Sequence, residues 1–130
     1  MADERQYRIL LAEDDEDICA FVERSISRVD GYIVEVAQTG EEAVRKLLAG
    51  DIDFAILDYY LPGKDAVQIM REVKAVRPLP PLVVSTGMAG PGFEKEMLAE
   101  GAIGYIPKPI DVRMLLQKIA NVLKERDGNT

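Results

Sequence analysis

Near its start the chain reads Ile9-Leu10-Leu11-Ala12-Glu13-Asp14-Asp15, an apolar run that ends directly in acidic side chains. A short continuous apolar run is typical of a strand that is buried on both faces of a parallel sheet. Carboxylates directly after it suit the cap and first turn of a helix, because negative charge is favourable at a helix N-terminus. This stretch therefore predicts a buried strand, an abrupt turn and then a helix.

The same alternation of strand and helix continues along the chain. Helical periodicity separates the apolar runs and ends near Gly31, Gly50 and Pro78. Thr39, which has capping-box spacing to Glu42, is expected to begin the second helix, and Asp65 is expected to cap the third. Residues 58–63 contain Pro-Gly and are expected to be loop. The expected strands cover 9–12, 33–36, 54–57, 82–84 and 103–106, a short fourth helix covers 93–99, and a last helix begins near 112 and frays into 127–130.

Five strands, each followed by a helix, predict an α/β fold with one doubly wound parallel sheet covered on both faces, since right-handed crossovers place helices over the strands. The chain has 130 residues, and we expect one domain over 1–130 with a core at about 6–126 and no output domain. The lone Cys19 is expected to pack near the core.

Composition excludes several function classes. A count of one cysteine and no histidine rules out disulfide frameworks, multi-cysteine zinc sites and histidine-based triads. The formal charge of -7 argues against direct nucleic-acid binding. The sequence has no apolar run that could cross a membrane and no signal-peptide pattern at its start, so we expect a cytoplasmic protein that does not bind membranes.

Polar residues stand at the carboxyl ends of four expected strands, which is where ligands bind in such sheets. They are Glu13 and Asp14 after the first strand, Asp58 after the third, Thr86 after the fourth and Lys108 after the fifth. Three carboxylates in one cleft repel one another, and one lysine cannot neutralise them all. Oxygen ligands of this kind suit a hard divalent cation, so we predict a Mg²⁺ site.

The same residues predict phosphoryl chemistry. With its charge offset by the metal and Lys108, Asp58 can act as a nucleophile toward phosphorus. Lys108, the Thr86 hydroxyl and nearby backbone N–H groups would then hold the phosphoryl oxygens.

Four motifs, in this order, resemble those of the receiver domains of bacterial two-component response regulators. They are Ile9-Leu10-Leu11-Ala12-Glu13-Asp14-Asp15, Leu57-Asp58-Tyr59-Tyr60-Leu61-Pro62-Gly63, Val83-Val84-Ser85-Thr86-Gly87 and Gly104-Tyr105-Ile106-Pro107-Lys108-Pro109. The resemblance covers nearly the whole chain. It implies the flavodoxin-like receiver fold, with five parallel strands in the order 2-1-3-4-5 and five helices.

The resemblance also implies roles for individual residues. Asp58 would accept a phosphoryl group from a sensor histidine kinase or phosphotransfer protein, and the backbone carbonyl of Tyr60 would join Glu13, Asp14 and Asp58 around Mg²⁺. On phosphorylation Thr86 would move toward the phosphoryl group and Tyr105 would swing inward. These movements would alter a partner-binding face made by the helix over 93–99, the strand over 103–106 and the last helix. A downstream protein target would bind there. A cis Lys108–Pro109 bond is implied as well.

Other functions remain open from the residues alone. One is a Mg²⁺-dependent phosphohydrolase with an aspartyl nucleophile, although 130 residues leave little room for a substrate-binding cap. Another is a receiver-like scaffold that is never phosphorylated. An FMN-binding protein is the weakest alternative, because the flavin phosphate would meet Glu13 and Asp14.

Overall fold

The computed structural model describes residues 5–128. Its main sheet is parallel and has five strands, in the order β2-β1-β3-β6-β7. Counted along the main sheet alone, this is the order 2-1-3-4-5 that the family resemblance implied, and the α/β fold class is confirmed. The strands are β1 (Tyr7–Ala12), β2 (Tyr32–Ala37), β3 (Phe54–Asp58), β6 (Leu82–Thr86) and β7 (Gly104–Pro107).

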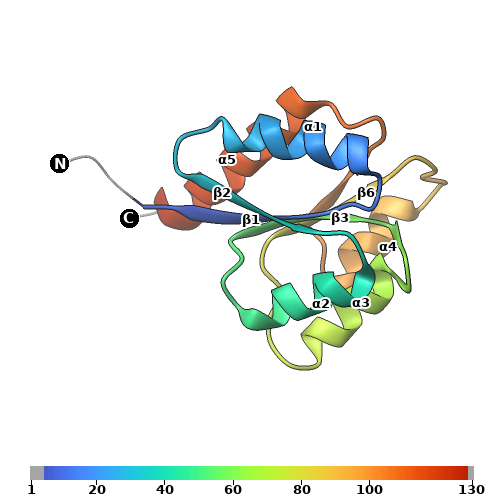
Figure 1. The fold of residues 1–130 in the computed structure, drawn as a ribbon. Helices are drawn as coiled ribbons and strands as arrows, with labels where there is room; N and C mark the ends of the chain where they lie inside the picture. The colour runs from blue at the N-terminus through green and yellow to red at the C-terminus, as the bar shows by residue number, and fades with distance from the viewer. Residues whose placement is uncertain (1–4, 129–130) are drawn as a thin grey trace.

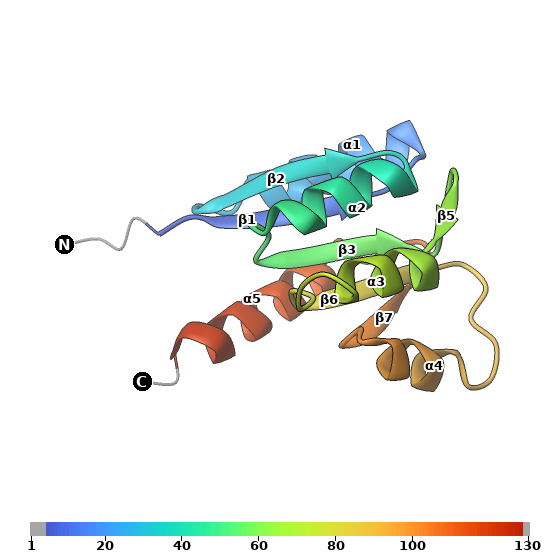
Figure 2. The ribbon, with the colours of Figure 1, turned by 90° about the horizontal axis from the view of Figure 1, so that it is seen from below.

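Helices cover both faces of the sheet, as Figure 1 shows with the sheet seen nearly edge-on. One face carries α1 (Glu16–Ser27) and α5 (Val112–Gly128), and the other carries α2 (Gly40–Ala49), α3 (Ala66–Lys74) and α4 (Phe93–Glu100). Figure 2 shows the second group in front of the sheet, with the loop before α4 projecting beyond it. Within residues 5–128, none of the helices is apolar over a length that could cross a bilayer.

Capping side chains fix where three helices begin. Asp15 accepts hydrogen bonds from the backbone N–H groups at the start of α1, and Thr39 accepts one from Glu42 at the start of α2. Asp65 and Gln68 form a reciprocal capping box at α3. Each cap satisfies N–H groups that have no partner inside the helix. The sequence predictions for these three positions are confirmed.

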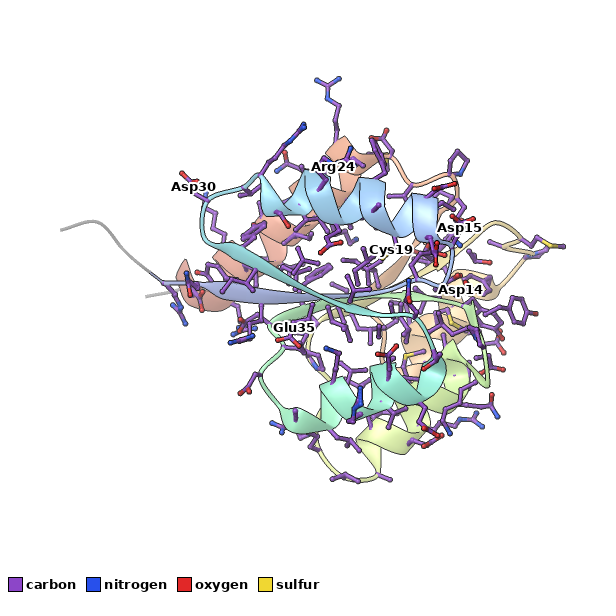
Figure 3. All side chains as sticks on the ribbon, viewed as in Figure 1. Asp14, Asp15, Cys19, Arg24, Asp30 and Glu35 are labelled. Atoms are coloured by element: carbon purple, nitrogen blue, oxygen red, sulfur yellow. The ribbon has the colours of Figure 1, made fainter. Side chains whose placement is uncertain are left out.

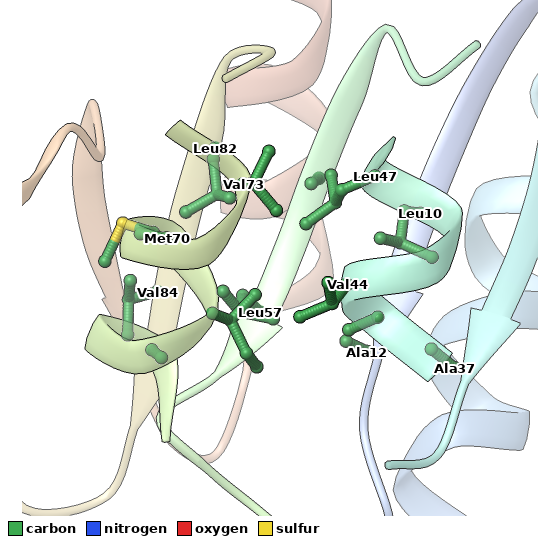
Figure 4. Close-up of a cluster of buried hydrophobic side chains, with 14 of the residues drawn as sticks. Leu10, Ala12, Ala37, Val44, Leu47, Leu57, Met70, Val73, Leu82 and Val84 are labelled. Atoms are coloured by element: carbon green, nitrogen blue, oxygen red, sulfur yellow. The ribbon is translucent and has the colours of Figure 1, made fainter. Parts of the chain in front are cut away.

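The sheet separates two clusters of buried apolar side chains. Cys19, which is 4% exposed, belongs to the cluster under α1 and α5, and Figure 3 shows it on the side of α1 that faces the sheet. Burial raises the pKa of its thiol. Figure 4 shows the cluster on the opposite face, where Leu57 and Val84 of the sheet and Met70 of α3 belong to one apolar cluster. Because every residue of β3 and β6 is buried, the packing on both faces sets where these strands end.

The segment after Asp58 differs from its prediction as loop. Its residues form a small antiparallel hairpin, with β4 (Tyr60–Leu61) paired to β5 (Lys64–Asp65). Pro62 and Gly63 make the turn, and Gly63 has φ +90°. The hairpin also docks on α2, because the Gly40 N–H donates to the Pro62 carbonyl at 3.0 Å. This tertiary contact orders a segment that turn residues alone predict to be irregular.

The end of α5 also differs from its prediction. The helix continues to Gly128, so the expected fraying is wrong at Asp127, while residues 129–130 lie outside the described part of the chain. The Tyr7 hydroxyl donates to Asp127 at 2.6 Å, and Arg126 pairs with Asp53 at 2.8 Å. These contacts with the sheet hold the last turn of the helix.

Candidate functional site

The predicted site residues lie at one edge of the sheet because the strands that carry them are parallel. Asp58 is the last residue of β3, and Thr86 is the last residue of β6. Glu13 follows β1, and Lys108 follows β7. The strand register aligns these ends, with Asp58 beside Ser85.

Three carboxylates form the centre of the site. Glu13, Asp14 and Asp58 each have an oxygen within 4.8 Å of the others. Glu13 and Asp58 are 2% and 7% exposed, whereas Asp14 is open to solvent. Figure 3 shows Asp14 at the carboxyl end of β1. Clustered carboxylate oxygens with an open side match the ligands that Mg²⁺ takes when it also keeps waters, so the donor set fits the predicted ion.

Lys108 bridges two of the carboxylates. Its Nζ atom lies 3.0 Å from Asp58 Oδ2 and 3.1 Å from Glu13 Oε1. Burial by itself lowers the pKa of Lys108, but hydrogen bonds to Asp58 and Glu13 outweigh burial and raise it. Lys108 therefore stays charged. The Lys108–Pro109 bond is cis, as the resemblance implied.

The buried Glu13 carboxylate has a raised pKa. Burial raises its pKa, the backbone N–H of Asp15 opposes this by donating to Glu13 Oε2 at 3.1 Å, and the charge of Asp58 raises it again. Two buried carboxylates therefore share one ammonium group, a charge arrangement that a cation would stabilise.

The three remaining predicted residues, Thr86, Tyr60 and Tyr105, lie on β6, β4 and β7. Thr86 is 5% exposed, and its Oγ1 accepts a hydrogen bond from the Met88 N–H at 3.2 Å. Tyr60 lies in β4 with its side chain exposed, and Tyr105 is half-buried in β7. Thr86 and Tyr60 border a cavity of about 190 Å³ whose other lining residues are Tyr59, Met88 and Phe93.

Sequence reasoning missed the row of aromatic rings beside this cavity. Tyr59 contacts both Tyr60 and Phe93, and Phe93 contacts Tyr105. Phe93 and Tyr59 come from segments that are far apart in the chain, so no spacing in the sequence signals their contact. Reasoning from strand ends also missed the backbone N–H of Asp15, which only the turn geometry brings to Glu13.

Comparison with known proteins adds to this geometry. The family model described as "Response regulator receiver domain" matches residues 9–120. The response regulator MprA of Mycolicibacterium vanbaalenii is 31% identical over 90% of this chain, and the match covers 50% of that protein. A cyclic di-GMP phosphodiesterase of Thermotoga maritima is 30% identical over 91% of the chain, which corresponds to 31% of its own length. The chain thus spans half or less of these two relatives.

A solved structure agrees with the fold. The CheY-like response regulator receiver domain protein of Methanospirillum hungatei superposes with a TM-score of 0.85 at 30% identity, covering 96% of this chain and 99% of that one. The family-model match and the fold of this chain together show that the chain belongs to the response regulator receiver domain family of two-component signalling.

Proposed function

We propose that the chain is a phosphorylation-controlled switch whose Asp58 accepts a phosphoryl group from the phosphohistidine of a sensor histidine kinase or phosphotransfer protein. One observation carries this proposal. Asp58 sits at a strand end, in contact with the Lys108 ammonium at 3.0 Å and with two further carboxylates within 4.8 Å. An exposed turn aspartate would have neither the cation nor the acidic neighbours.

The groups around Asp58 suit in-line phosphoryl transfer. Lys108 holds Oδ2, which leaves the second oxygen free to attack phosphorus. As that oxygen–phosphorus bond forms, the phosphorus–nitrogen bond to the donor imidazole breaks, and its electron pair stays on the nitrogen. Lys108 then pairs with a phosphoryl oxygen, and the Thr86 hydroxyl donates a hydrogen bond to another.

Glu13, Asp14, Asp58 and the backbone carbonyl of Tyr60 would hold Mg²⁺. When bound, the ion supplies positive charge that offsets the carboxylates and the phosphoryl oxygens. The acidic cluster supports the three carboxylate ligands, and the Tyr60 carbonyl is proposed from the family resemblance.

The output of the switch is proposed to be a protein-binding face formed by α4, β7 and α5. Tyr105 in β7 lies between the two helices in the chain, and its ring is half-buried. The net charge of -7 supports a protein target over nucleic acid. That residues 1–130 form a single domain, and that the protein is cytoplasmic and does not bind membranes, stay predictions.

The test is to incubate the protein with Mg²⁺ and acetyl phosphate or a phosphorylated kinase, and to measure its intact mass. We expect one phosphoryl group per chain, labile to hydroxylamine as an acyl phosphate is, and none in Asp58→Asn. Asp51→Asn, an exposed carboxylate outside the cluster, is the matched control and should be labelled like the wild type.

The same experiment separates the alternative functions. Many turnovers of a phosphate ester, with Asp58 as the nucleophile, would indicate a phosphohydrolase. A chain that stays unmodified with every donor would indicate a scaffold and contradict the proposal.

A further inference from the structure

Four aromatic rings run in series from the acceptor loop to the proposed output face. The ring centroids of Tyr60 and Tyr59 lie 4.7 Å apart, those of Tyr59 and Phe93 5.5 Å apart, and those of Phe93 and Tyr105 5.4 Å apart. All three pairs meet edge to face, at interplanar angles of 86°, 63° and 80°. Such pairs attract one another beyond the effect of burial alone. We call these four residues the aromatic row.

The acceptor end of the row is fixed to the backbone next to Asp58. The Tyr59 N–H donates to the Ser85 carbonyl at 2.9 Å, and the Tyr59 carbonyl accepts from the Ala66 N–H at 2.8 Å. Because both backbone groups are bonded, the position of the Tyr59 ring follows that of the strand end that carries Asp58.

The middle of the row, Phe93, packs against the core at a helix start that has no side-chain cap. Phe93 is the first residue of α4, and the N-cap position, Gly92, has no side chain to satisfy the helix start. Met97 is the only buried residue of α4. A cavity of about 190 Å³, lined also by Tyr59 and Thr86, lies beside the Phe93 ring. A displacement of Tyr59 can therefore move Phe93 and the start of α4 together.

The far end of the row is Tyr105, whose side chain is only partly buried. Its backbone pairs with Val84 in the sheet, so the side chain can change while the strand stays in place. The packed ring of Phe93 favours the present position of the Tyr105 ring over its alternatives.

We propose that Phe93 is a positioning residue that holds Tyr105 and links it to Tyr59, so that a change at the acceptor loop reaches the α4–β7 face through ring contacts. This inference rests on the proposed function, and it adds a route through Phe93 to the roles of Thr86 and Tyr105. A route of this kind needs a measured coupling between its two ends.

The test uses the full chain labelled with 3-fluorotyrosine, with the ¹⁹F signals assigned by single Tyr→Phe variants. Mg²⁺ and beryllofluoride, a phosphoryl mimic, are added while the Tyr59 and Tyr105 signals are recorded. We expect both signals to shift in the wild type. In Phe93→Leu the Tyr59 shift should remain, and the Tyr105 shift should fall at least threefold.

Three further variants make the result specific. Phe93→Tyr keeps the ring and should restore the Tyr105 response. Phe93→Met is a second ringless variant, used if Phe93→Leu does not fold. Phe21→Leu removes an exposed ring from α1, which lies outside the row, and should respond like the wild type.

The failures can be told apart. If Tyr59 responds and Tyr105 keeps its full shift in both ringless variants, Phe93 does not couple them and the inference is wrong. If neither tyrosine responds in the wild type and acetyl phosphate leaves Asp58 unmodified, the proposed function fails and the inference fails with it.

Discussion

Lys108 is a single ammonium group facing two buried carboxylates. It contacts Glu13 at 3.1 Å and Asp58 at 3.0 Å, so its charge offsets only one of the two. Burial raises the pKa of Glu13, and the nearby charge of Asp58 adds to this. The local charge balance, with Asp14 included, therefore favours a further cation at this strand end.

The Ser85 hydroxyl, unlike the Lys108 ammonium, is a buried polar group without a hydrogen-bond partner among the described residues. It lies on β6 beside Asp58, is 1% exposed, and its Oγ has no hydrogen-bond partner among residues 5–128. An unpaired buried hydroxyl costs about 1–3 kcal/mol. We expect Ser85→Ala to leave the free energy of unfolding unchanged or to raise it by up to about 1 kcal/mol, as measured by urea denaturation.

The control for Ser85 is a hydroxyl that does have a partner. Thr39 caps α2 by accepting from the Glu42 N–H at 3.1 Å, so Thr39→Ala should cost about 1 kcal/mol. If Ser85→Ala lost as much stability as Thr39→Ala, the Ser85 hydroxyl would have a partner after all, such as a buried water.

Among the elements, α2 and the β4–β5 hairpin meet at a glycine. A Cβ atom at Gly40 would lie 2.6 Å from Lys64 Cβ and 3.1 Å from the Lys64 nitrogen. Alanine is favoured over glycine in a helix by about 1 kcal/mol, but overpacking costs about 1–3 kcal/mol. The hairpin backbone would have to move, so the clash should outweigh the helix preference.

We therefore expect Gly40→Ala to lower the free energy of unfolding by up to about 2 kcal/mol. It should also slow the labelling of Asp58 by acetyl phosphate, because the hairpin begins two residues after Asp58. Gly90→Ala, where a Cβ would meet open space, is the control for both measurements. Equal stability and equal labelling rates in the two variants would contradict this account.

An ion pair joins α3 to α4. Arg71 donates to Glu100 from Nε at 3.0 Å and from Nη2 at 2.6 Å. The hydrogen bond from Arg71 holds the pKa of Glu100 below its ordinary value of 4.5. A carboxyl group with a lowered folded-state pKa stabilises the protein above its unfolded pKa, and this contribution disappears as the pH falls through the folded pKa.

Arg71→Gln should therefore have a lower urea midpoint than the wild type near neutral pH. The two midpoints should converge as the pH falls to about 3, and high salt should also reduce the difference because the pair is near the surface. Arg24→Gln, an exposed arginine on α1, controls for the loss of positive charge. If the difference between the two urea midpoints stayed constant with pH, the ion pair with Glu100 would not be the source of the stability lost in Arg71→Gln.

At the scale of the whole molecule, the acidic site should couple metal binding to stability. An ion that binds only the folded state stabilises it by about 1.4 kcal/mol at ten times its Kd. For a domain of this size that corresponds to a rise of about 3–6 °C in the thermal midpoint. We expect this rise when Mg²⁺ replaces EDTA, measured by calorimetry.

Asp14→Asn should lose most of the rise, because it removes one of the three clustered carboxylates. Asp30→Asn removes an exposed carboxylate in the turn between α1 and β2, outside that cluster, and should keep it. The same rise in both variants would place the stabilising ion away from the strand ends.

Local patterns were enough to predict most of the architecture. Continuous apolar runs predicted the five strands of the main sheet, and Asp15, Thr39 and Asp65 predicted three helix starts. The strand-end residues could be named as well, because parallel strands all end at one edge. Roles for these residues came from chemistry and family resemblance, which is why they stay proposals until the acceptor is labelled.

The sequence by itself thus determined which elements form and which side chains stand at their ends, since periodicity, capping and turn chemistry act over a few neighbouring residues. Only the tertiary structure decided the rest: the β4–β5 hairpin on α2, the α5 end held by Tyr7 and Asp53, and the ring contacts of Phe93. Each depends on residues that are distant in sequence and meet only after the sheet has formed, so no local pattern can encode it.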